Sequence, residues 1–76
     1  MTMLLTPNQI RALRKRLKMN STAFATLLGV TTNAVARWEL GDRRPRIETH
    51  DKMNELAKAN GIDVQTLDQE PVKQPA

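Results

Sequence analysis

Residues 21–41 read STAFATLLGVTTNAVARWELG, and the small residues in this run have the spacing that two short helices need to cross at a sharp angle. Ala25 is small enough to let a second helix approach the first. Gly29 lies where the first helix must end, because a residue without Cβ adopts a positive φ at little cost. Val35 then faces back into the crossing, so the run predicts two helices joined by a tight turn.

Capping residues and apolar stripes predict further helices on both sides of this pair. Thr6 and Gln9 match a capping box and Pro7 suits the first helical position, so a helix begins there. The helices are expected over residues 7–17, 21–28, 32–40 and 47–59, followed by a short turn that carries Val64 and Leu67. The inner stripe of the long fourth helix is expected to consist of Ile47, His50, Met53, Leu56 and Ala57. The sequence therefore predicts an all-α fold of five helices.

The chain of 76 residues is expected to form one domain over residues 6–68, between an N-terminal arm at 1–5 and a disordered tail at 69–76. The tail has two prolines and no apolar pattern. The absence of cysteine and the single histidine exclude a disulfide framework and a thiolate or histidine-built zinc site. No apolar run is long enough for a membrane helix, so we expect a soluble cytoplasmic protein without cofactor or metal.

The net charge of +4 hides an uneven distribution. Residues 1–46 carry nine Lys and Arg against two acids, a balance of +7, whereas residues 47–76 carry three against six, a balance of −3. A solvated helix is the default explanation for a single basic run such as RKRLK. A second cluster of three arginines flanks the helix pair, however, which favours a polyanion partner. Because a helix-turn-helix places its second helix in the DNA major groove, the expected polyanion is double-stranded DNA.

Residues of the helix pair and its surroundings also match a family pattern. They are Leu13, Arg14, Ala25, Gly29, Val30, Val35, Trp38, Glu39, Gly41 and Pro45. On these residues the chain resembles the Cro/CI-type helix-turn-helix family, which includes phage repressors, Cro proteins and many short bacterial regulators. The match covers about residues 6–68 and implies a five-helix, lambda-repressor-like domain with the helix-turn-helix at helices 2 and 3.

The resemblance implies that the start and outer face of the third helix contact bases. This role falls here to Thr32, Asn33, Ala36 and Arg37. Arginine can donate two hydrogen bonds to guanine, asparagine can pair with adenine, and a methyl side chain can meet the thymine methyl. Arg37 is therefore the first candidate for specificity. The competing explanation, a solvated helix arginine, is weaker because of the motif around it.

Phosphate contacts are expected from helix starts and from the basic loop, at Ser21, Thr31, Arg43, Arg44 and Arg46. Such contacts fix the register on DNA without reading its sequence. The resemblance also implies a partly buried ion pair between Arg14 and Glu39, which the helical wheel supports. Arg14 is thus better explained as structural than as a phosphate contact, although an arginine has donors for both.

Four residues depart from the family pattern or compete for a functional role. Ser21 replaces a frequent glutamine and is too short to make that residue's contacts. Lys18 stands where glycine commonly ends the first helix, which predicts an altered or slightly strained turn. Trp38 falls on the inner face, so we expect a core residue rather than a base-stacking platform. His50 is expected to be packed, with a pH-sensitive dimer contact as the alternative.

Two functions remain open from the sequence. The first is a sequence-specific transcription regulator, a homodimeric repressor or autoregulator on a palindromic operator. The resemblance places its dimer contacts at Ile62, Val64 and Leu67, and the outward-facing Leu27 and Leu40 either pack on a partner chain or are exposed. The second is an antitoxin that binds a toxin and autoregulates its operon, for which the short tail offers little material. An enzyme is not expected, because no catalytic group or metal-ligand cluster can be assembled.

Overall fold

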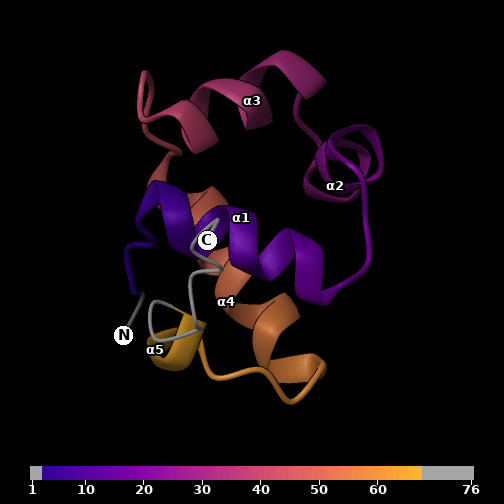
Figure 1. The fold of residues 1–76 in the computed structure, drawn as a ribbon, viewed down its shortest axis with the longest axis vertical. Coiled ribbons are helices and arrows are strands. Elements are labelled where there is room, and N and C mark those ends of the chain that lie inside the picture. The colour runs from indigo at the N-terminus through magenta and orange to yellow at the C-terminus, as the bar shows by residue number, and fades with distance from the viewer. Residues whose placement is uncertain (1–2, 68–76) are drawn as a thin grey trace, which may run out of the picture.

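The computed structural model describes residues 3–67 and places five helices in that part of the chain (Figure 1). In chain order these are α1 (Pro7–Arg16), α2 (Ser21–Leu28), α3 (Thr32–Leu40), α4 (Ile47–Ala59) and α5 (Val64–Leu67). No strand occurs among the described residues, so the predicted all-α fold is confirmed. The expected tail at 69–76 lies outside the described residues, as does residue 68 at the expected domain boundary.

Helix α1 lies near the centre of the molecule, with α2 and α3 at one end and α5 at the other (Figure 1). It packs against α3 and α5, while α2 packs against α3 and α4. Leu13, Phe24, Val35 and Met53, which come from four different helices, are each 0% exposed. Trp38 is 5% exposed, which confirms it as a core residue.

The start of α1 is fixed by the capping box that the sequence predicts. The Thr6 hydroxyl accepts a hydrogen bond from the Gln9 N–H at 3.1 Å, and Gln9 Oε1 accepts one from the Thr6 N–H at 2.9 Å. The buried Gln9 side chain also donates to the Val64 carbonyl at 3.3 Å. One side chain therefore begins α1 and joins it to α5, and the local sequence pattern predicts only the first of these roles.

Helix α1 ends at Arg16, one residue earlier than predicted, and the chain reverses at Lys18. Lys18 has a φ of 58°, in the left-handed region, and the next N–H, of Met19, donates to the Arg14 carbonyl at 3.1 Å. A residue with a Cβ loses roughly 1–2 kcal/mol in this conformation. The strained turn that the sequence predicts at Lys18 is therefore present.

The turn between α2 and α3 is built as the spacing of small residues predicts. Gly29 has a φ of 73°, and in that conformation the Val30 N–H reaches the Ala25 carbonyl at 2.9 Å. The Thr31 hydroxyl then accepts from the Ala34 N–H at 3.1 Å and begins α3. Because Ala25 is only 2% exposed, the two helices meet closely over it.

The predicted inner stripe of α4 is correct for His50, Met53 and Ala57, which are buried, but Leu56 is only partly buried. For Ile47 the prediction is wrong, because this side chain is 56% exposed. Ile47 is the first residue of α4. A helical wheel gives the direction of a side chain but not its depth along the helix axis, and at Ile47 the stripe has already left the core.

Residues 3–5, which the sequence assigns to an N-terminal arm, lie against α4. Leu5 is 6% exposed and donates its N–H to Nδ1 of His50 at 3.1 Å. The side-chain amide of Asn54 donates to the Met3 carbonyl at 2.8 Å. Burial lowers the pKa of His50 below its usual value. Because Nδ1 accepts a hydrogen bond, the ring is neutral with its proton on Nε2, and His50 is a packed core residue of this chain.

Candidate nucleic-acid interface

Helix α3 runs along one edge of the molecule (Figure 1). The four side chains predicted to contact bases are all exposed on it: Thr32, Asn33, Ala36 and Arg37. On the opposite side of the same helix, Val35 and Trp38 are buried. The helix therefore presents short polar groups, one methyl group and one long cation at an open surface, while its other side is fixed to the core.

The first turn of this surface is connected to α2. The Thr32 hydroxyl lies 3.4 Å from that of Thr22 and donates to it, which links the predicted base contact to the neighbouring helix. The Thr32 hydroxyl oxygen retains its capacity to accept a hydrogen bond. The sequence offers no local signal for Thr22, because the two residues meet only when α2 and α3 pack. Ser21, a predicted phosphate contact, is partly buried at the first residue of α2.

The three loop arginines that are predicted to contact phosphate lie beside α3. They line a hollow of about 530 Å³, which we call the basic hollow; its lining residues are Val30, Thr31, Asn33, Ala34, Arg37, Trp38, Arg43, Arg44, Arg46 and Thr49. Four arginines and no acidic residue belong to this lining. Asn33 and Arg37 are part of it, so predicted base contacts and predicted phosphate contacts form one continuous surface. A concave surface with charges of one sign raises the local concentration of polyanions.

The amino end of α4, whose first turn also carries Glu48, borders the basic hollow. Arg46 is the N-cap of α4 but makes no side-chain capping bond, and Thr49 in the first turn lines the hollow. The first N–H groups of a helix and its dipole favour an anion at this end. The loop thus brings arginine side chains and a helix start to the same place.

The expected ion pair between Arg14 and Glu39 is present and joins α1 to the end of α3. Arg14 Nε lies 2.8 Å from Glu39 Oε2, and Arg14 Nη2 lies 3.0 Å from Glu39 Oε1. The third nitrogen, Nη1, donates to the Met19 carbonyl at 3.1 Å, which holds the turn between α1 and α2. Arg11 adds a longer contact of 3.3 Å from Nε to Glu39 Oε1. Through these bonds Arg14 connects α1 to α3 and to the turn before α2.

Glu39 is ionised in this setting. Burial by itself raises the pKa of the Glu39 carboxyl, but the hydrogen bonds and charge of Arg14, together with those of Arg11, outweigh it, so that this pKa lies below its usual value. The hydrogen bond to Glu39 raises the pKa of Arg14 in turn, against the opposing effect of burial. The Glu39 side chain is 5% exposed, so the pair is shielded from solvent and salt.

A second ion pair lies at the outer side of α3. Arg37 donates from Nη1 to Oδ2 of Asp42, and both side chains are largely exposed, at 46% and 59%. Asp42 belongs to the loop directly after α3. Asp42 is one of the two acids among residues 1–46, and its pairing with Arg37 is not predicted from the sequence, because it depends on how the chain turns at Gly41.

The residues predicted to form a dimer interface are placed unequally. Val64 and Leu67 are 7% and 3% exposed and belong to the core of this chain, which removes them from the surface that a second copy can contact. Ile62 is partly buried and borders a groove between the ends of α1 and α4. The expectation is therefore corrected at two of three positions.

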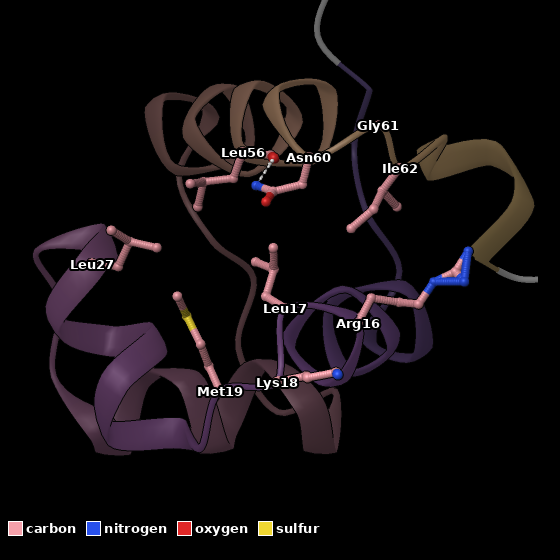
Figure 2. A pocket seen from close by; sticks show the side chains of 9 residues that line it. All are labelled: Arg16, Leu17, Lys18, Met19, Leu27, Leu56, Asn60, Gly61 and Ile62. Carbon is pink, nitrogen blue, oxygen red and sulfur yellow. Dashed lines mark hydrogen bonds between the residues drawn. The ribbon is translucent and has the colours of Figure 1, made fainter.

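This groove, which we call the α1–α4 groove, has a volume of about 500 Å³. Figure 2 shows the apolar side chains that converge on it, namely Leu17, Met19, Leu27, Leu56 and Ile62. Leu27 is 46% exposed. Leu27 and Leu56 also line an adjoining hollow of about 290 Å³ with Leu28, Lys52, Glu55 and Ala59. None of the residues lining the groove belongs to α3 or to the basic hollow.

Between residues 3 and 67, no three His, Cys, Asp or Glu side chains are grouped closely enough to hold a metal ion. Within the same range no helix has the length and apolar character needed to cross a bilayer.

Comparisons with known proteins agree with this geometry. Residues 10–67 match a helix-turn-helix family model. The chain is also similar to the DNA-binding domain of the P22 C2 repressor (residues 1–76), whose structure was determined by nuclear magnetic resonance. The TM-score is 0.63 and the sequence identity 29%, over 100% of this chain and 96% of that one. A search of curated proteins finds no match.

Proposed function

The chain belongs to the Cro/CI-type helix-turn-helix family, and on this premise we propose that it is a DNA-binding transcription regulator that acts as a homodimeric repressor on a palindromic operator. The observation that carries the proposal is the continuous surface formed by the outer side of α3 and the basic hollow. Side chains suited to bases lie on a helix of the right width for the major groove, and arginines suited to phosphates lie next to it.

Base recognition is assigned to the outer side of α3. Arg37 donates two hydrogen bonds to a guanine, and Asn33 pairs with an adenine. Ala36 meets a thymine methyl group, and the Thr32 hydroxyl oxygen accepts a hydrogen bond from a base edge, since its proton is donated to Thr22. One bidentate pair supplies about 1–3 kcal/mol of discrimination against a wrong base, so Arg37 dominates the specificity of each half-site.

Phosphate binding is assigned to the basic hollow. Arg43, Arg44 and Arg46 neutralise backbone charge there, and the uncapped start of α4 adds N–H donors. Thr31 contributes its hydroxyl proton, since its oxygen already accepts from the Ala34 N–H. These contacts supply most of the affinity but no sequence preference.

We place the contact with a second copy at the α1–α4 groove. Five apolar side chains line the groove, and one of them, Leu27, is 46% exposed. A two-fold axis places the same apolar groove on both copies, so that each copy covers the exposed leucine of the other. Because the groove is separate from the basic hollow, both copies remain able to bind DNA.

Sedimentation equilibrium tests this interface. Leu27→Asp introduces a charge into the groove at an exposed position, so the chain folds but is expected to be monomeric. Leu40→Asp is the matched control, because Leu40 is 77% exposed and lies outside the groove. Dimers that persist in Leu27→Asp, or monomers in both variants, would place the interface elsewhere.

Selection of bound DNA from a random duplex pool tests the function itself. We expect a palindromic consensus whose half-sites are about 34 Å apart, the repeat that two recognition helices on one face of the duplex require. A consensus with no palindrome would contradict the homodimer and leave the DNA-binding function standing. A pool without any enrichment would overturn sequence-specific binding and favour the antitoxin alternative, in which the main partner is a toxin.

A further inference from the structure

The ion pair between Arg37 and Asp42 is not explained by the stability of the fold. Both side chains are about half exposed, and pairs of this kind contribute little to folding. The pair nevertheless joins the residue to which we assign base recognition to the only acidic side chain in the loop of residues 41–46, which carries three arginines. An acidic group costs affinity at a DNA-binding surface, so its place there requires a reason.

The backbone brings Asp42 to Arg37. Gly41 ends α3 with a φ of 79°, and the chain then folds back over the last turn of the helix. The Asp42 N–H donates to the Arg37 carbonyl at 2.9 Å, and the Arg43 N–H reaches the same oxygen at 3.3 Å. The Asp42 side chain therefore starts from a fixed point one turn from Arg37, and the pair is a consequence of how the helix ends.

Asp42 bonds to only one of the three guanidinium nitrogens of Arg37. Asp42 accepts from Nη1, whereas the guanidinium carries further N–H groups on Nε and Nη2. Nε and Nη2 form one side of the planar group, and two parallel N–H groups on one side match the O6 and N7 acceptors of guanine. A carboxylate at Nη1 thus orients the planar guanidinium and leaves its Nε–Nη2 side available for a base.

We propose that Asp42 is a positioning residue for base recognition, which holds Arg37 toward guanine and away from phosphate. The proposal rests on the base-reading role of Arg37 given above. Arg37 lines the basic hollow with three other arginines, so phosphates drawn to that hollow compete with the base for its guanidinium. The Asp42 carboxylate repels phosphate and occupies Nη1, and both effects favour the base.

The test compares two variants that each remove one negative charge near the loop. Asp42→Asn removes the charge that pairs with Arg37, whereas Glu48→Gln changes an exposed acid in the first turn of α4, two residues from Arg46. Affinities are measured for the selected operator and for operators with each guanine replaced. Both variants are expected to bind all DNA more tightly, because a like charge has been removed.

The two variants are expected to differ in how strongly they discriminate between the operator and guanine-substituted sites. In Asp42→Asn the ratio between operator and guanine-substituted site is expected to fall by about fivefold, a part of what a bidentate pair supplies. In Glu48→Gln the ratio stays at the wild-type value. Asp42→Asn in an Arg37→Ala background is expected to change the ratio no further, because Asp42 acts through Arg37. Thermal melting checks that the Asp42 variant is folded, as its exposure predicts.

The outcomes distinguish this proposal from the function it rests on. If Arg37→Ala alters the base preference but Asp42→Asn keeps the discrimination of Glu48→Gln, the positioning role is wrong and base reading by Arg37 stands. If Arg37→Ala leaves the base preference unchanged, the assignment of Arg37 is wrong and the role of Asp42 falls with it. If Asp42→Asn loses affinity for cytosine sites alone, Asp42 contacts a base directly and is not a positioning residue.

Discussion

The two sides of α3 use the same chemical groups in opposite ways. On the core side, Arg14 holds a Glu39 side chain that is 5% exposed through two hydrogen bonds. On the outer side, Arg37 contacts an Asp42 side chain that is 59% exposed through one. A buried pair cannot open without leaving a lone charge in the interior, whereas an exposed pair opens at little cost. The inner pair therefore fixes where α3 lies, and the outer pair contributes little to the fold and leaves Nε and Nη2 of Arg37 available for a base.

The largest expected effect is on the free energy of unfolding, when the acid of each ion pair is neutralised in turn. Glu39→Gln leaves Arg14 partly buried without its counter-charge, so the free energy of unfolding is expected to fall by about 3 kcal/mol. Asp42→Asn, the matched change on the outer side, is expected to change it by no more than about 0.5 kcal/mol. Urea unfolding of both variants measures the difference. Equal losses would mean that the two sides of α3 do not differ in this way.

The pH dependence of stability tests whether the buried His50, like the pair of Arg14 and Glu39, is part of what holds the core together. Burial lowers the pKa of His50, so as pH falls past the unfolded value of 6.5 the unfolded chain binds a proton before the folded one. Stability is thus full above pH 6.5 and decreases below it, by about 1.4 kcal/mol for each unit of pKa depression once the folded pKa has been passed. Unfolding between pH 7 and 5 measures this decrease, above the range in which Glu39 titrates.

His50→Asn is the control for this decrease. The asparagine amide keeps an acceptor near the Leu5 N–H but cannot titrate, so the dependence between pH 7 and 5 is expected to disappear. His50 is the one histidine of the sequence, which makes the assignment direct. A decrease that survives in His50→Asn would show that another group causes it.

The sequence predicts well what depends on local geometry. Thr6 and Gln9 cap α1, Gly29 turns the chain between α2 and α3, and Lys18 adopts the left-handed conformation, all because short-range sterics and hydrogen bonds decide these positions. The pair of Arg14 and Glu39 is long-range, and the family resemblance predicts it with the support of a helical wheel. On α3 the wheel also separates the exposed outer residues from Val35 and Trp38.

The sequence does not predict how deeply a side chain is buried or which contacts form only when the chain folds. Ile47 lies on an apolar stripe but at the end of its helix, so direction alone predicts burial wrongly. The family resemblance places Val64 and Leu67 in a dimer interface, and no local signal indicates that α5 packs on α1 and buries both side chains within this chain. Gln9 acquires its second role only when the distant Val64 carbonyl lies beside it, and Asp42 meets the Arg37 side chain only because the chain turns back at Gly41.

The smallest expected effect concerns the turn that Arg14 holds from the core side. Lys18→Gly removes the left-handed strain of roughly 1–2 kcal/mol but adds backbone freedom to the unfolded chain, so a net stabilisation of about 0.5–1 kcal/mol is expected. Lys15→Gly removes the same charge inside α1 and is expected to destabilise by about 1 kcal/mol. Urea unfolding gives both signs. Because Lys18 lies outside the basic hollow, its variant is expected to retain the wild-type base preference. Lys18 also lines the α1–α4 groove, so sedimentation equilibrium checks that the variant has the wild-type oligomeric state; a changed preference in that state would mean that the turn behind α1 and the outer side of α3 are coupled.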